Sequence, residues 1–283
     1  MTKLSKEQVQ RNKIILVLIL CAIALVIYLM IVQSIKNYEK KMMNHKVNVQ
    51  YTYQEALALQ MKSGAQYSDG VQWSDATKSQ MDEYLNPVKF YHHPEQKYQF
   101  LNLGMSQKVS YVKLNQLLKG KGILDGLGKS FAKASRIEDI NEIYLINHAL
   151  LETGKGTSTL ARGVTVDDKG RVGYGEKKYY NFFGIGAYDH APVKEAAKFA
   201  YQQGWDTPEK AVMGGAQFIK DAFIQQQNQN TLYGMRFNPA KPGKHQYATD
   251  VRWAHHNARG IAHDYKKLKL KGKYFTRYYY KQQ

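Results

Sequence analysis

The sequence predicts a mainly α-helical domain that carries one small β-hairpin lobe and is preceded by a single membrane-spanning helix. Three observations support this fold class. Residues 14–32 form an uninterrupted run of uncharged, mostly apolar positions. Most of the remaining chain places its apolar residues three or four positions apart, which is the spacing of one helix face. Residues 164–174 instead alternate on either side of a glycine-containing turn, as β-hairpins do.

The apolar run is long enough to cross a bilayer. At about 1.5 Å per helical residue, its 19 positions span ~28 Å, which matches the hydrocarbon core of a membrane. A cleaved signal peptide would have a shorter apolar core followed by small residues, whereas this run ends in large side chains. Basic residues flank the run on both sides, so the positive-inside rule does not decide its orientation.

Residues 33–108 are predicted to form a stalk and an N-terminal extension. Helical spacing predicts helices over residues 53–62 and 80–85. Between them we expect a loop rich in Ser, Gly and Asp around Asp69-Gly70. Residues 98–104 resemble a short strand or an extended segment.

Residues 109–283 are predicted to form the main domain. Two of its helix starts have clear signals, because Thr207 precedes Pro208 and Thr249 precedes a strongly amphipathic stretch. The expected elements, in chain order, are helices at 111–118 and 123–134, a helix that ends at Glu152, the hairpin, a helix from Asp189 or Pro192 to Gly204, and helices that begin near 206 and 249.

The composition limits the possible partners. The formal net charge of +18 implies an anionic partner, yet no base-reading helix or zinc-finger spacing is present, so nucleic acid is the poorest candidate. Cys21 is the only cysteine and lies in the apolar run, which excludes disulfides and a cysteine nucleophile outside the membrane. The histidines at 255, 256 and 263 lack a zinc-binding spacing, so we expect no metal and no cofactor.

Glu152 is the strongest candidate for a catalytic group. It lies in the last turn of a helix that Gly154 is expected to end, beside two leucines. The carbonyl end of the helix dipole and the apolar neighbours both disfavour the carboxylate, so the pKa of Glu152 should be raised. A carboxyl group that stays protonated can donate a proton to a leaving oxygen. A solvent-exposed Glu at a helix end fits the spacing equally well.

Four short segments in the second half of the chain form an ordered set of motifs. They are residues 148–161, 180–185, 229–239 and 245–250. Together they resemble the signatures of bacterial cell-wall N-acetylglucosaminidases, over roughly residues 50 to 270. The resemblance implies a lysozyme-like α+β fold and hydrolysis of the β-1,4 bond between N-acetylglucosamine and N-acetylmuramic acid in peptidoglycan. It also implies that Glu152 is the catalytic acid.

The resemblance assigns further residues to the site. It places Asn181 in the sugar groove, where an amide can bond an N-acetyl group while Phe182 or Phe183 presents a ring to a sugar face. Core packing is the alternative for the two phenylalanines. Tyr247 is the second-strongest catalytic candidate after Glu152, since its hydroxyl could contact the water, the acetamido group or the acid. Tyr233 is also expected to bind substrate.

His148 and the second catalytic group stay open. His148 shares a helix face with Glu152, so it is either a supporting partner of the acid or a structural histidine. Stabilisation of the positively charged transition state requires a group on the opposite face of the sugar. The candidates are Glu176, Asp168, Asp189 and the acetamido oxygen of the substrate, with Glu176 taken as the provisional choice.

These inferences predict a membrane-anchored peptidoglycan hydrolase that trims nascent glycan strands. Residues 1–13 would form a cytoplasmic tail, and the C-terminal domain would face the wall. Anionic wall polymers and an integral membrane protein, docked on the small-residue face around Cys21, are the other expected partners. The alternatives are a lytic transglycosylase that cuts after N-acetylmuramic acid and a non-catalytic scaffold that binds glycan.

Overall fold

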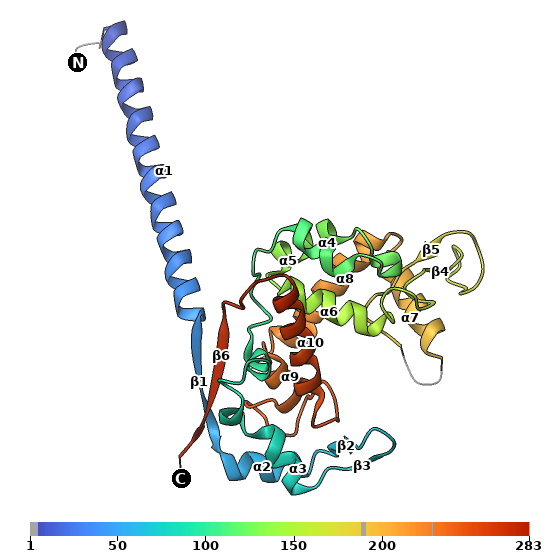
Figure 1. Cartoon of the computed structure of the whole chain (residues 1–283). Helices are drawn as coiled ribbons and strands as arrows, with labels where there is room; N and C mark the ends of the chain where they lie inside the picture. The colour runs from blue at the N-terminus through green and yellow to red at the C-terminus, as the bar shows by residue number, and fades with distance from the viewer. Residues whose placement is uncertain (1–4, 188–190, 228, 283) are drawn as a thin grey trace. The chain divides into compact units, whose positions relative to one another are not determined.

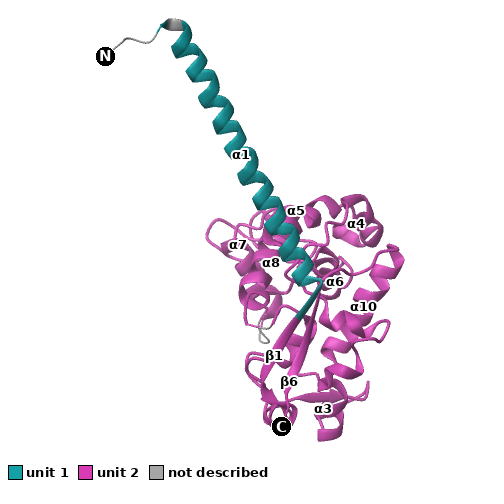
Figure 2. Ribbon diagram, turned by 90° about the vertical axis from the view of Figure 1, so that its left-hand side faces the viewer, with its two compact units in different colours: residues 1–45 teal, residues 46–283 magenta. Residues whose placement is uncertain are grey.

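The structure is a computed structural model that describes residues 5–187, 191–227 and 229–282 (Figure 1). It divides into two compact units, residues 1–45 and 46–283 (Figure 2). The first unit is almost entirely helix α1 (Lys6–Met42), which begins with a capping box between Ser5 and Gln8. Within the described residues, α1 is the one helix long and apolar enough to cross a membrane. It extends beyond the predicted run at both ends, where helix-forming Glu, Gln and Lys residues continue it.

The described residues of the second unit are mainly helical and form three two-stranded sheets, which confirms the predicted fold class. The strands pair as β1 with β6, β2 with β3 and β4 with β5. Their bounds are β1 (Asn44–Thr52), β2 (Gln66–Ser68), β3 (Trp73–Asp75), β4 (Val164–Thr165), β5 (Lys178–Tyr179) and β6 (Phe275–Lys281). The α-helices are α2 (Tyr53–Met61), α3 (Lys78–Leu85), α4 (Tyr111–Leu118), α5 (Gly128–Glu138), α6 (Glu142–Glu152), α7 (Pro192–Gln202), α8 (Pro208–Ile219), α9 (Leu232–Phe237) and α10 (Trp253–Lys267). Short helical turns are η1 (Pro87–Lys89), η2 (Gln96–Phe100), η3 (Gly122–Leu124) and the π-turn η4 (Lys220–Ile224).

Helix α6 lies in the larger of the two hydrophobic cores that the described residues form. Figure 1 shows it running between α4 and α10, and it also contacts α5. Seven of its eleven residues are buried, so nearly the whole helix is enclosed up to its C-terminal turn. This enclosure fixes the position of whatever side chains leave the last turn of α6.

The smaller core joins residues from distant parts of the chain. Leu57, Met81 and Leu85 pack there with Tyr233 and Tyr278, all of them nearly inaccessible to solvent. The adjacent sheet pairs β1 with β6, which come from the two ends of this unit. Residues before and after position 109 therefore share one core.

Several predicted elements differ from the structure. Residues 98–104 are not a strand, because η2 covers the start of this segment and only Leu101 forms a bridge, to Phe275. The loop around Asp69-Gly70 is the turn of the hairpin β2–β3. The predicted helix at 123–134 is displaced to α5, and the last helix begins at Trp253. Asp189 lies outside the described residues.

The β-hairpin lobe exists, but its second strand is not where the alternation indicated. Asp167 accepts backbone hydrogen bonds within the turn, and Val166 bridges to Val172 as expected. Gly173 and Gly175 then adopt positive φ angles of 88° and 77° and redirect the chain. The strand that pairs with β4 is consequently β5, four residues beyond the predicted one.

Candidate active site

Glu152 leaves the end of α6 half-enclosed by protein. Asn141 caps the start of the helix, accepting hydrogen bonds from the backbone N–H groups of Ile143 and Tyr144. Gly154 ends it with a φ of 55°, as the sequence indicated. The Glu152 side chain is 36% exposed, and burial of the rest raises the pKa of its carboxyl group. Its position therefore favours the protonated acid that can donate to a leaving oxygen.

His148 lies one turn before Glu152 and forms the centre of a small polar network. Its Nε2 lies 3.7 Å from Glu152 Oε1 and shares a 2.9 Å hydrogen bond with the Tyr247 hydroxyl. Its Nδ1 shares a 3.2 Å hydrogen bond with the Tyr144 hydroxyl. Burial lowers the pKa of His148 to about 4, so the ring is neutral near pH 7. A neutral ring donates from one nitrogen and accepts at the other, which matches its two tyrosine partners.

Tyr247 is brought to this network from the segment before α10. Its backbone N–H donates to the carbonyl of Met235, 2.9 Å away. Its ring packs between those of Phe223 and Trp253, with centroid distances of 4.9 and 4.7 Å. Burial raises the pKa of the Tyr247 hydroxyl, so it stays a neutral phenol that can donate a hydrogen bond.

The loop after Tyr180 closes against the acid. Gly184 has a φ of 63°, and a Cβ on it would lie 3.0 Å from Glu152 Oε2. The backbone of this loop therefore approaches the carboxylate more closely than a side chain would allow. Phe183 in the same loop sets its ring edge-on to His148, with centroids 5.7 Å apart.

Asn181 holds this loop together, a different role from the predicted contact with an N-acetyl group. Only 2% of it is exposed. Its Nδ2 donates to the carbonyls of Ile185 and Ala196, at 2.8 and 3.3 Å, and its Oδ1 accepts from the N–H groups of Phe183 and Ile185. These four bonds use the hydrogen-bonding capacity of the amide, so none remains for a sugar.

We expect Asn181→Ala to lower the free energy of unfolding by about 3 kcal/mol, because it leaves several buried backbone groups unpaired. Activity should fall with it, since the loop that contacts Glu152 loses its support. The measurement is urea denaturation together with hydrolysis of purified cell wall. Asn257→Ala is the control, because within the described residues that amide bonds only the carbonyl of Trp253 in its own helix. An unchanged stability with a raised KM would instead favour a direct contact with substrate.

Of four other predicted site residues, three are buried in the hydrophobic cores and the fourth does not contact the acid. Phe182 and Phe183 are 0% and 4% exposed and belong to the larger core, so core packing, the stated alternative, describes both. Tyr233 is fully buried in the smaller core and donates to the carbonyl of Leu85. Glu176 is exposed on the segment before β5, and no contact with Glu152 is present among the described residues.

Tyr144 and Gly184 belong to the site and were not predicted. A signal existed for Tyr144, because positions 144, 148 and 152 are four apart and so lie on one helix face. The approach of Gly184 to Glu152 had no such local signal, since it depends on how a loop folds back over the helix.

The buried His148 should make the protein less stable in mild acid. Its pKa is 6.5 in the unfolded chain and about 4 in the folded one, so the unfolded state binds more protons between these values. Stability is therefore lost as the pH falls from about 6.5 to 4, by up to ~3 kcal/mol. We expect His148→Gln to flatten this dependence in urea titrations at pH 7 and 5. His92→Gln, at an exposed position, should keep the slope, and equal slopes for wild type and His148→Gln would refute the prediction.

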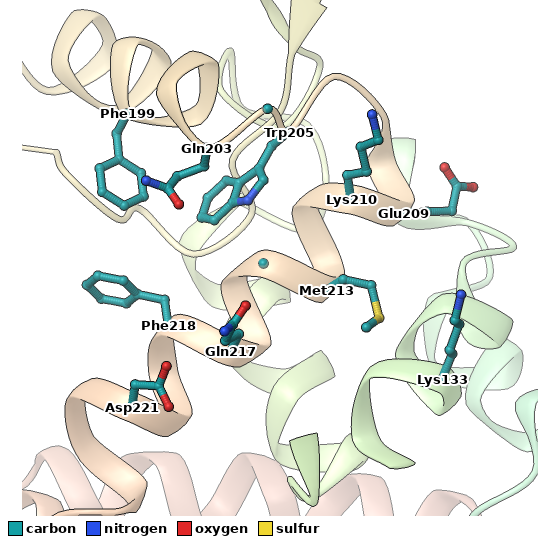
Figure 3. Close-up of a pocket in the computed structure, with 12 residues that line it drawn as sticks. Lys133, Phe199, Gln203, Trp205, Glu209, Lys210, Met213, Gln217, Phe218 and Asp221 are labelled. Carbon is teal, nitrogen blue, oxygen red and sulfur yellow. The ribbon is translucent and has the colours of Figure 1, made fainter. Parts of the chain in front are cut away.

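A concavity of about 760 Å³, separate from the residues at the end of α6, lies between α7 and α8 (Figure 3). Phe199, Trp205 and Phe218 line it, and Trp205 closes against Gly214. The next residue, Gly215, faces Phe183 instead, so this concavity opens on a different side of α8 from the acid. It does not contain Glu152, His148 or Tyr247, and the chemistry described above belongs to the end of α6.

Comparison with known proteins points to one family. Residues 128–267 match the family model "Glucosaminidase: Mannosyl-glycoprotein endo-beta-N-acetylglucosaminidase". The chain is 48% identical over 221 residues to bifunctional autolysin of Staphylococcus aureus, covering 76% of this chain and 18% of that protein. The chain thus spans less than a fifth of these curated relatives.

Solved structures from Staphylococcus aureus share the fold. Glucosaminidase B superposes with a TM-score of 0.74 at 41% identity, covering 84% of this chain and 94% of that one. Autolysin E in complex with the muropeptide NAM-L-Ala-D-iGlu gives a TM-score of 0.65 at 37% identity, with 82% and 98% covered. A catalytic mutant of autolysin E, in which a glutamate is replaced by alanine, has been solved with the disaccharide NAG-NAM.

Proposed function

This chain belongs to the glucosaminidase family, and on that basis we propose that it is an endo-β-N-acetylglucosaminidase that hydrolyses peptidoglycan. The scissile bond would be the β-1,4 linkage from N-acetylglucosamine to N-acetylmuramic acid. The observation that supports this most is the carboxyl group of Glu152, half-buried at the end of α6 beside His148 and Gly184. The muropeptide and disaccharide bound by autolysin E have the chemistry of the proposed substrate.

In the proposed reaction Glu152 protonates the glycosidic oxygen as the bond to the sugar breaks. The neutral His148 and the Tyr247 hydroxyl orient the acid and the substrate around it. Positive charge then develops on the sugar and must be stabilised from the opposite face. Since no second carboxylate contacts this network in the described part of the chain, we assign that role to the acetamido oxygen of the substrate. Water then adds to the anomeric carbon and returns a proton to the Glu152 carboxylate, which completes the hydrolysis. Glu176 remains the protein alternative.

Product analysis tests this proposal. The full chain in detergent is incubated with purified peptidoglycan, and the fragments are reduced with borohydride and examined by mass spectrometry. Hydrolysis as proposed leaves a reducing N-acetylglucosamine, which becomes the sugar alcohol. A 1,6-anhydro-muramic end would identify a lytic transglycosylase instead. Uncleaved glycan would indicate a non-catalytic protein that binds glycan.

We further propose that α1 anchors the protein in the cell membrane, with residues 1–13 cytoplasmic and residues 46–283 outside. Helix α1 continues ten residues past the apolar run, from 33 to 42, which adds only ~15 Å at about 1.5 Å per residue. Strand β1 follows almost at once. Such a short connection would keep the active site near newly made glycan, and an integral membrane partner could dock on α1 around Cys21. The net charge of +18 suits anionic wall polymers as a further partner.

Deletion of residues 1–32 should therefore remove the selectivity for nascent strands. Full-length protein and a secreted form lacking these residues are expressed at matched abundance, and the lengths of pulse-labelled and old glycan are compared. We expect the full-length form to shorten mainly labelled strands and the secreted form to shorten both. Equal shortening of nascent strands by the two forms would show that tethering confers no selectivity.

A further inference from the structure

A cavity of about 680 Å³ adjoins the end of α6 on another side of the helix from the acid. It is bounded by α4, α6 and α10, which Figure 1 shows next to one another. Helix α6 contributes one stripe of residues at helical spacing, Asn147, Leu150 and Leu151, and Gly154 follows at its end. Leu151 is 62% exposed although it is a large apolar side chain directly before Glu152.

Two Gly-Lys-Gly segments form the rim of this cavity. They are residues 120–122 and 154–156, and each places its lysine in the lining. A Cβ on Gly156 would lie 2.0 Å from the carbonyl oxygen of Lys121, so only glycine allows this contact. The carbonyl of Gly156 also accepts from the N–H of Ile123 at 3.2 Å. The two lysine-bearing turns are therefore held in direct backbone contact with each other.

Part of the cavity lining is polar and hydrogen-bonded. Asn147 Nδ2 donates to Asp264 Oδ2 at 2.9 Å, which ties α6 to α10. Asp264 is 9% exposed, and the lining also includes His263 and Lys267 from the same helix.

The cavity is strongly cationic. Three lysines line it, against one buried carboxylate that already has a partner. Among the described residues, no ion pair joins Lys121, Lys155 or Lys267 to a carboxylate within 4.0 Å. Three lysines around apolar walls form a site for an anionic group attached to an apolar or amide-containing chain.

We propose that this cavity binds the carboxylate-bearing peptide stem of the peptidoglycan strand, so that the enzyme recognises the stem as well as the sugars. The proposal rests on the proposed function, because the stem is attached to the N-acetylmuramic acid next to the scissile bond. Lys121, Lys155 and Lys267 would pair with stem carboxylates, while Leu150 and Leu151 would contact its alanine side chains.

The distance between the two sites suits such a stem. The stripe facing the cavity and the face of His148 and Glu152 are about 130° apart around α6. At a radius of about 5–6 Å, this separation corresponds to ~12 Å along the helix surface. An extended peptide advances about 3.5 Å per residue, so three or four residues reach from a sugar at the acid into the cavity.

The test compares glycan strands with intact stems and the same strands after an amidase has removed the stems. The variant K121Q/K155Q/K267Q, made in the full chain and assayed in detergent, removes the three charges. We expect the ratio of kcat/KM for stem-bearing over stripped strands to fall about tenfold, or ~1.4 kcal/mol. Most of the loss should be in KM, because the contact is made in the ground state and the transition state alike.

A matched control distinguishes recognition of the peptide stem from an effect of the lower net charge. K62Q/K194Q/K198Q changes three exposed lysines elsewhere and lowers the net charge equally. It should keep the wild-type ratio, whereas the single variant Lys155→Gln should show a smaller fall in the same direction. Strands with amidated stems should behave as stripped strands do.

The proposal is overturned if the wild-type ratio is one, if the cavity variant keeps the wild-type ratio, or if the control loses as much. Failure of the proposed function would look different, since the wild type would then either leave 1,6-anhydro-muramic ends or cleave neither substrate. Binding of stem-bearing strands to Glu152→Gln, measured by calorimetry with and without the three cavity substitutions, gives the same comparison without turnover. Thermal melting of each variant checks that it is folded.

Discussion

Glu152→Gln is expected to lower the turnover of purified peptidoglycan about 10³-fold while the protein stays folded. The amide is nearly the same size as the carboxyl group, but it has no acidic proton to give to the leaving oxygen. The loss should appear in kcat, with KM close to the wild-type value. Activity within tenfold of wild type would rule out Glu152 as the acid.

The pH dependence of the wild-type enzyme gives an independent check. Burial raises the pKa of Glu152, so the protonated form persists to higher pH than for an exposed glutamate. The rate should decline as the pH rises through this raised pKa. The folded protein also binds this proton more tightly than the unfolded chain does. Ionised Glu152 therefore destabilises the fold above its folded pKa, and this effect disappears below the unfolded pKa.

The direction of this pH effect on stability distinguishes a catalytic glutamate from a structural one. Because Glu152→Gln removes an unfavourable buried charge, its melting temperature at neutral pH should equal or exceed that of the wild type. The difference should shrink as the pH falls. A structural glutamate would show the reverse, with a lower melting temperature and no selective loss of turnover.

Local sequence signals predicted the parts of the fold that depend on local interactions. Helices α6 and α8 have capping residues, Asn141 and Thr207, and regular apolar spacing, and both occur where expected. Strand β6 was missed because its partner β1 lies more than 220 residues earlier in the chain, and no local pattern reveals such a pairing. The position of β5 was missed because two glycines redirect the chain after the turn.

The difference between local and long-range signals also applies to the site residues. Glu152 and His148 are four residues apart on one helix, so their proximity follows from helical geometry. Tyr247 meets His148 across 99 residues, and only the family resemblance suggested that it belongs to the site. The resemblance placed Asn181 in the right loop but not in its role. An amide that bonds backbone groups two and four residues ahead is a turn-forming residue, and that function competes with substrate binding.

Tyr247→Phe is expected to lower kcat about 10²-fold and to change KM by less than about threefold. The substitution removes the hydroxyl that is hydrogen-bonded to His148 Nε2, the ring nitrogen that faces Glu152. Without this bond the imidazole loses the partner that fixes its tautomer and its orientation beside the acid. Steady-state kinetics on peptidoglycan, with strand binding measured separately, would show the predicted division between kcat and KM.

Tyr144→Phe provides the matched control, because Tyr144 bonds the other ring nitrogen of His148. Each substitution leaves one nitrogen of a buried imidazole without its tyrosine partner, so each should lower the free energy of unfolding by about 1–3 kcal/mol. Only Tyr247 belongs to the side of the ring that faces the acid, and only its loss should reduce kcat strongly. If both variants lost activity in proportion to their stability, Tyr247 would be a packing residue, and the acid would act without it.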